Sequence, residues 1–194
     1  MQRYLVIAAV VIVALGAGML LRHELNENRL EAVNSAEVSA ERLAFTLPDL
    51  SGRPRDFAEW DGKSRIVNFW ATWCAPCRRE IPLLKDTQEA HGDDLQVIGI
   101  AVDFVEDVIT YAQEAQFNYP VLVGQEDAMA VAEASGVPFI GLPFTLVVTR
   151  DGELLAAHMG EIHAPQIDTI VDVLEQLDAG LTDTAGARAA LAEL

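Results

Sequence analysis

Cys74 and Cys77 are the only cysteines in a chain of 194 residues, and two residues separate them. A pair at this spacing can form a structural disulfide, supply half of a metal site, or carry out thiol–disulfide exchange. As a structural cross-link it would contribute little, because a disulfide stabilises through the loop entropy that it removes and this loop is very short. The rest of the sequence must distinguish between the three uses.

The cysteines are expected where a strand meets a helix. Residues 66–70 form a short apolar run, IVNFW, which predicts a buried central strand. A helix is predicted over residues 75–90, with an interruption and kink at Pro82. The free N–H groups and macrodipole at a helix N-terminus favour an anion, so we expect Cys74 to be the nucleophilic thiolate. Cys77, three residues later, is placed to resolve a mixed disulfide.

Metal binding is the weaker interpretation of the pair. A zinc or copper site needs further ligands, and the chain has no other cysteine. His91, His158 and His163 are dispersed along the sequence rather than spaced as ligands. We therefore predict redox exchange, with no metal and no cofactor.

Charge is distributed very unevenly along the chain. The formal net charge is −17, and residues 86–194 contain 20 acidic residues against two arginines. Because phosphate binding requires a basic face, this composition argues against a nucleic-acid partner.

The N-terminus predicts a membrane segment. Residues 4–21 contain no charge, and as a helix they would extend roughly 27 Å, close to the hydrocarbon thickness of about 30 Å. We interpret residues 1–22 as a single-pass anchor, with a cleaved signal peptide as the alternative. Residues 23–42 are polar and predict a tether. In either case the remaining chain would lie on the extracytoplasmic, periplasmic side of the cell membrane.

The remaining patterns alternate between strands and helices, which predicts an α/β domain with a mixed sheet. In chain order they are a β-hairpin before the first central strand, a strand at 95–102, a helix at 105–116, a strand at 119–124, a helix from 127 that ends at Gly136, paired strands at 144–149 and 153–159, and a helix from Pro165 to Gly180.

The motif FWATWCAPC, followed by Pro82 and later by the segment GLPFT, resembles the thioredoxin fold. The exported, membrane-tethered branch of TlpA and ResA is the more similar one. The resemblance covers residues 43–178 and leaves 179–194 as a C-terminal tail. It implies a thioredoxin-like domain with a central mixed β-sheet flanked by helices and an N-terminal β-hairpin extension.

The resemblance also implies residues that contact the substrate. It assigns this role to Trp73, Pro76, Leu142 and Pro143, with a cis peptide bond before Pro143. Pro138, in GVPF, is the rival position for the cis proline. Only Pro143 directly precedes the apolar strand FTLVV, so we expect the cis bond there.

Glu80 is the third candidate catalytic residue, beside Cys74 and Cys77. The buried aspartate of cytoplasmic thioredoxins is replaced here by Asn68, whose amide is no proton acceptor. Glu80 lies three residues after Cys77, on the same helical face, and similarity to ResA implies that it exchanges protons with the cysteines. The alternative is an exposed helix carboxylate next to Arg78 and Arg79, which are themselves expected at the surface.

Together these features predict an extracytoplasmic thiol–disulfide oxidoreductase that reduces disulfides in client proteins. The resemblance implies clients from cytochrome c or copper-centre assembly and a membrane thiol carrier as electron donor. Two alternatives remain open: a disulfide-forming oxidant, and a copper-binding assembly module that uses the two thiols as ligands.

Overall fold

The computed structural model describes residues 42–192 and residue 194. The predicted anchor and nearly all of the predicted tether lie outside the described residues. None of the helices in the described part is long and apolar enough to span a membrane.

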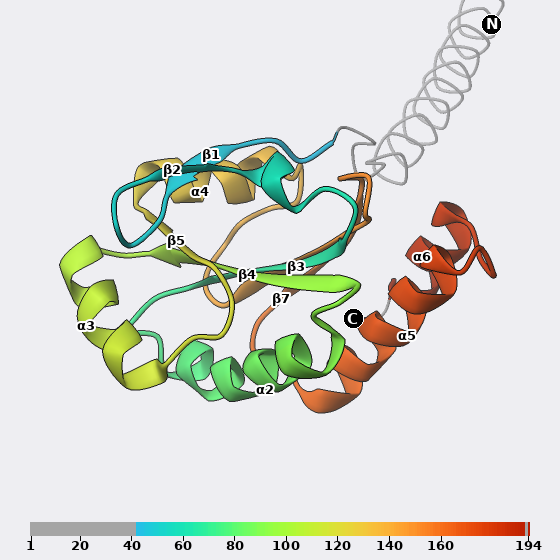
Figure 1. Ribbon diagram of the computed structural model, residues 1–194. Helices are drawn as coiled ribbons and strands as arrows, with labels where there is room; N and C mark the ends of the chain where they lie inside the picture. Colours follow the sequence, from blue (N-terminus) through green and yellow to red (C-terminus); the bar gives the residue numbers. More distant parts are fainter. Residues whose placement is uncertain (1–41, 193) are drawn as a thin grey trace, which may run out of the picture. The chain divides into compact units, whose positions relative to one another are not determined.

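A mixed five-stranded sheet forms the centre of the domain (Figure 1). Across the sheet the strands are β5 (Val121–Gly124), β4 (Leu95–Val102), β3 (Ser64–Trp70), β6 (Phe144–Val148) and β7 (Leu154–Met159). Strand β4 pairs in parallel with β5 and with β3, whereas β6 pairs antiparallel with β3 and with β7. This is the predicted thioredoxin-like architecture.

Helices and a small hairpin cover the two faces of the sheet (Figure 1). One face packs against α2 (Ala75–His91), α3 (Val105–Ala115), α5 (Ala164–Asp178) and α6 (Thr184–Ala190). The other packs against β1 (Thr46–Pro48), β2 (Pro54–Asp56), the 3-10 helix η1 (Phe57–Trp60) and α4 (Glu126–Ala134). The antiparallel β1–β2 pair confirms the predicted N-terminal hairpin.

Strand β3 is the centre of both cores because every one of its residues is buried. Successive side chains of a strand point to opposite faces. Ile66 and Trp70 therefore belong to the core under α2, and Val67 and Phe69 belong to the core on the other face. Asn68 lies on the same face as Ile66 and Trp70, which brings its polar side chain beneath α2.

The predicted interruption of the first helix at Pro82 is wrong, because α2 is one continuous helix of 17 residues. A proline removes the hydrogen bond to the carbonyl four residues earlier, here that of Arg78. Both Pro82 and Arg78 are exposed, so the freed carbonyl lies on the solvent side of the helix.

Two helix ends also differ from the sequence pattern. Helix α4 ends at Ala134 rather than at Gly136, and Gly136 has a φ of 74°, the left-handed conformation that glycine favours after a helix. In the predicted tail, α6 begins after Asp183, whose carboxylate accepts a hydrogen bond from Gly186 N at 2.8 Å. Ala187 in this helix and Leu191 after it are buried in the core beneath the sheet.

Candidate active site

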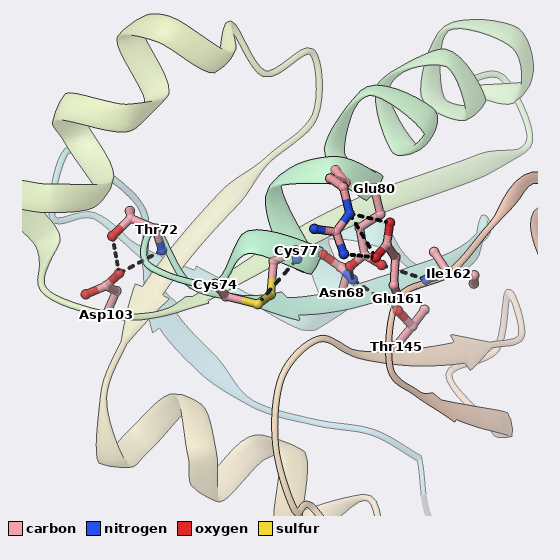
Figure 2. Close-up of a disulfide and its surroundings, with 10 residues drawn as sticks. Asn68, Thr72, Cys74, Cys77, Glu80, Asp103, Thr145, Glu161 and Ile162 are labelled. Carbon is pink, nitrogen blue, oxygen red and sulfur yellow. Dashed lines mark hydrogen bonds and ion pairs between the residues drawn. A yellow bond between two sulfur atoms is a disulfide. The ribbon is translucent and has the colours of Figure 1, made fainter.

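Cys74 and Cys77 form a disulfide at the N-terminus of α2 (Figure 2). Their Cα atoms are 5.3 Å apart. Cys74 is the N-cap residue, and its Sγ accepts a hydrogen bond from Cys77 N at 3.3 Å. This is the junction of β3 and α2 that the sequence predicts.

The two sulfurs have different surroundings. The helix dipole and the Cys77 N–H both favour negative charge on Cys74 Sγ once the disulfide is reduced. Cys77 is fully buried, while Cys74 keeps 5% of its surface exposed. An incoming sulfur therefore meets Cys74 first, which supports its role as nucleophile and that of Cys77 as the resolving cysteine.

Glu80 is buried beneath α2, with 1% of its surface exposed. Its Oε1 accepts a hydrogen bond from Asn68 Nδ2 at 2.7 Å, and its Oε2 accepts one from Ile162 N at 2.8 Å (Figure 2). Asn68 Nδ2 also donates to Thr145 Oγ1 at 3.0 Å. The alternative of an exposed surface carboxylate is wrong, because the i, i+3 spacing from Cys77 turns Glu80 toward the sheet.

Burial changes the protonation of Glu80. Loss of solvation raises the pKa of its carboxyl group to about 7, although the hydrogen bonds from Ile162 and Asn68 oppose the shift. A carboxyl group with this pKa can both take and release a proton near neutral pH. Glu80 is therefore suited to proton exchange one helical turn from Cys77.

The neighbouring arginine is exposed but paired. Arg79 forms a bidentate ion pair with Glu161, the residue before Ile162. The hydrogen bond from Arg79 holds the pKa of the Glu161 carboxyl below its ordinary value. This pair ties the start of α2 to the loop that supplies the Ile162 N–H to Glu80. Sequence reasoning missed this loop, because a backbone N–H leaves no signal in residue type.

The predicted substrate-contacting residues come from two segments. Trp73 is 70% exposed, and Pro76 is half-buried in the first turn of α2. The Leu142–Pro143 peptide bond is cis, as predicted, and the peptide bond before Pro138 is not.

The cis proline and the disulfide lie at the same end of the sheet, where β3 ends and β6 begins. Phe144, the residue after Pro143, pairs with Phe69 at the end of β3. Leu142 packs against the core that contains both cysteines. The structure thus places the GLPFT segment at the end of the sheet where the disulfide lies. The contact of these residues with a substrate stays a prediction.

Metal ligands are not gathered around the cysteines in the described part of the chain. No group of three or more histidine, cysteine or acidic residues there is placed to hold a metal ion. The copper-binding alternative required His158 or His163 beside Cys74, and the described residues supply no such third ligand.

Comparison with known proteins places the chain in a family. The model of the AhpC/TSA family matches residues 38–157. The chain belongs to the AhpC/TSA family. This AhpC/TSA-family chain is 26% identical over 172 residues to the thiol-disulfide oxidoreductase ResA of Halalkalibacterium halodurans, covering 87% of this chain and 92% of the relative. It is 26% identical over 133 residues to the thioredoxin-like protein YneN of Bacillus subtilis, covering 66% and 75%.

Solved structures share this fold. A thiol:disulfide interchange protein of the thioredoxin family from Chlorobium tepidum superposes with a TM-score of 0.62 at 28% identity, covering 69% of this chain and 94% of that one. A putative DsbE from the same organism superposes with a TM-score of 0.60 at 23% identity, covering 74% and 97%. The AhpC/TSA-family protein is a thiol–disulfide oxidoreductase with a thioredoxin-like fold.

Glu80 is expected to make stability depend on pH. Its pKa rises from 4.5 in the unfolded chain to about 7 in the folded protein, so the folded state binds more protons between these values. The stabilisation is complete below pH 4.5 and is lost as pH rises through 7, a change of about 3 kcal/mol in the free energy of unfolding. Glu80→Gln should remove this pH dependence, measured by urea unfolding of the oxidised protein.

The matched control is Glu89→Gln, the same substitution at an exposed position of α2. It should keep the pH dependence of the wild type. Parallel pH curves for the wild type and Glu80→Gln would contradict the prediction.

Proposed function

We propose that this oxidoreductase reduces disulfides in client proteins on the extracytoplasmic side of a membrane. The observation that carries the direction of electron flow is the burial of Glu80 one turn after Cys77. The Glu80 carboxylate disfavours a thiolate at nearby Cys77, and a dithiol whose thiolates are less stabilised is the stronger reductant.

The reaction begins with the reduced protein. The Cys74 thiolate attacks a client disulfide, a bond forms between Cys74 Sγ and one client sulfur, and the second client sulfur leaves as a thiolate that takes a proton from water. The Cys77 thiol then gives its proton to the Glu80 carboxylate and its sulfur attacks Cys74 Sγ. This step breaks the mixed disulfide and releases the client sulfur that was bound to Cys74 as a thiolate, which takes a proton from water. Two electrons pass to the client, and the Cys74–Cys77 disulfide is the product.

A client chain would be held by the segments on either side of the disulfide. Trp73 offers an exposed ring next to Cys74. Leu142 and Pro143 offer a backbone segment just before β6, along which an extended client peptide adds as a short strand. Backbone pairing tolerates many client sequences, whereas the side chains beside it select among them.

The location and partners in this proposal come from the sequence and the relatives. The uncharged run at residues 4–21 would anchor the protein in the membrane with the catalytic domain outside the cytoplasm. The relatives are named as thiol–disulfide oxidoreductases and interchange proteins. We extend this to clients from cytochrome c or copper-centre assembly, with a membrane thiol carrier returning electrons to the Cys74–Cys77 disulfide.

Trapping in cells tests the assigned cysteine roles and identifies the clients. Cys77→Ser should accumulate mixed disulfides on Cys74, because the resolving sulfur is absent. Cys74→Ser should capture none, because the remaining sulfur is buried. The adducts are separated on non-reducing gels and identified by mass spectrometry. Equal capture by the two variants would contradict the roles. The oxidant alternative would be favoured if Cys74 captured only proteins that donate disulfides to this protein.

Proton exchange by Glu80 is tested by kinetics. In the wild type, the rate of mixed-disulfide resolution should rise as pH increases through about 7, where Glu80 ionises. Glu80→Gln should lower this rate roughly 10²-fold at neutral pH, because the proton acceptor is lost. Single-turnover reduction of insulin over a range of pH provides the measurement. Glu89→Gln serves again as control, and an unchanged rate profile in Glu80→Gln would exclude the role.

Membrane location is tested by labelling in intact cells. After mild reduction, a membrane-impermeant maleimide should label Cys74 in the full chain, and the labelled protein should be recovered with the membranes. A chain that lacks residues 1–22 should be labelled only after lysis. Labelling of the full chain only after lysis would place the catalytic domain in the cytoplasm and contradict the proposal.

A further inference from the structure

A second buried carboxylate lies on the opposite side of the disulfide from Glu80 (Figure 2). Asp103 directly follows β4 and is 7% exposed. Its Oδ2 accepts hydrogen bonds from Thr72 N at 2.8 Å and from Thr72 Oγ1 at 2.6 Å. Its Oδ1 accepts one from Phe104 N at 2.9 Å, and its own N–H donates to Gly124 O at 3.0 Å. Asp103 is therefore fixed by two strand ends and in turn holds Thr72.

Thr72 belongs to the short segment that joins β3 to the disulfide. Within this segment, Cys74 N donates to Ala71 O at 3.2 Å, and Cys77 N donates to Cys74 Sγ at 3.3 Å. These bonds are local and do not connect the segment to the rest of the sheet. The two bonds from Thr72 do, and both are charge-assisted, which makes them shorter and stronger than neutral hydrogen bonds.

The same contact positions two exposed aromatic residues. Trp73 follows Thr72 and Phe104 follows Asp103, so each ring lies one residue from the contact. Trp73 is 70% exposed and Phe104 is 59% exposed. Large apolar side chains that stay exposed beside a reactive group are typical of a binding surface.

We infer that Asp103 is a positioning residue for client recognition. Through Thr72 it sets the path of the chain into Cys74, and it fixes the backbone next to Trp73 and next to Phe104. A client segment with an apolar side chain next to its cysteine then contacts both rings while its disulfide meets Cys74. The inference rests on the proposed function, since it concerns the same disulfide and the same protein clients.

Two variants of the full chain test this inference. Thr72→Val removes the hydroxyl donor but keeps the side-chain shape and the Asp103 charge. Asp103→Asn removes the charge and one acceptor. The probes are insulin, as a protein disulfide, and 5,5′-dithiobis(2-nitrobenzoate), as a small disulfide that needs contact only with the sulfur.

Both variants should lower kcat/KM for insulin reduction roughly tenfold, because a misplaced reacting group loses productive orientation. The rate with the small disulfide should stay within about twofold of the wild type. Thr72→Ser, which keeps the hydroxyl donor, should reduce insulin with the kcat/KM of the wild type. Asp107→Asn, the same substitution at an exposed position in the first turn of α3, should leave both rates unchanged.

The pH profile of Cys74 alkylation separates positioning from a direct effect of charge. If Asp103 acted through its charge, only Asp103→Asn would shift the profile, and Thr72→Val would reduce insulin like the wild type. Positioning requires that Thr72→Val lose insulin activity with an unchanged profile.

Wild-type insulin kinetics in Thr72→Val, or equal losses with the two probes, would overturn the inference. A wild-type protein that does not reduce insulin would instead defeat the proposed function.

Discussion

A carboxyl group buried beside a disulfide needs hydrogen-bond donors from the surrounding fold, and Glu80 receives them from two separate elements. Asn68 comes from the central strand, and Ile162 comes from the loop before α5. The donors keep the carboxyl group in place, while burial raises its pKa to about 7. Helix α2, strand β3 and this loop therefore have to be assembled before the group can exchange protons with the resolving cysteine.

The two cysteines depend on different parts of this assembly. Cys77 points into the core, within one turn of Glu80, where solvent is excluded. Cys74 caps the helix, where the macrodipole favours its thiolate and where the chain leading to it is tied to Asp103 through Thr72. The two sulfurs thus have the surroundings that the proposed roles of attack at the surface and proton transfer in the interior require, although only two residues separate them.

Much of the fold follows from local patterns in the sequence. Strand β4 has the predicted bounds, and the helix after Cys74 begins where its capping position requires. The errors occur where context overrides a local rule. Pro82 does not interrupt α2, because the carbonyl that it leaves free lies toward solvent. The C-terminal residues, which the sequence analysis leaves as a tail, form α6 against the core, with Ala187 buried.

By itself, the sequence determined the chemistry that the site can perform: two thiols at a helix N-terminus, with a carboxylate at i, i+3 from the second. These features depend on spacing within one element, and a helix fixes such spacing wherever it packs. Only the tertiary structure decided that Glu80 is buried and that Ile162, 82 residues away, donates to it. It also decided that Asp103 holds a residue 31 positions earlier. Burial and contacts between distant segments depend on how the elements pack, which the local pattern does not encode.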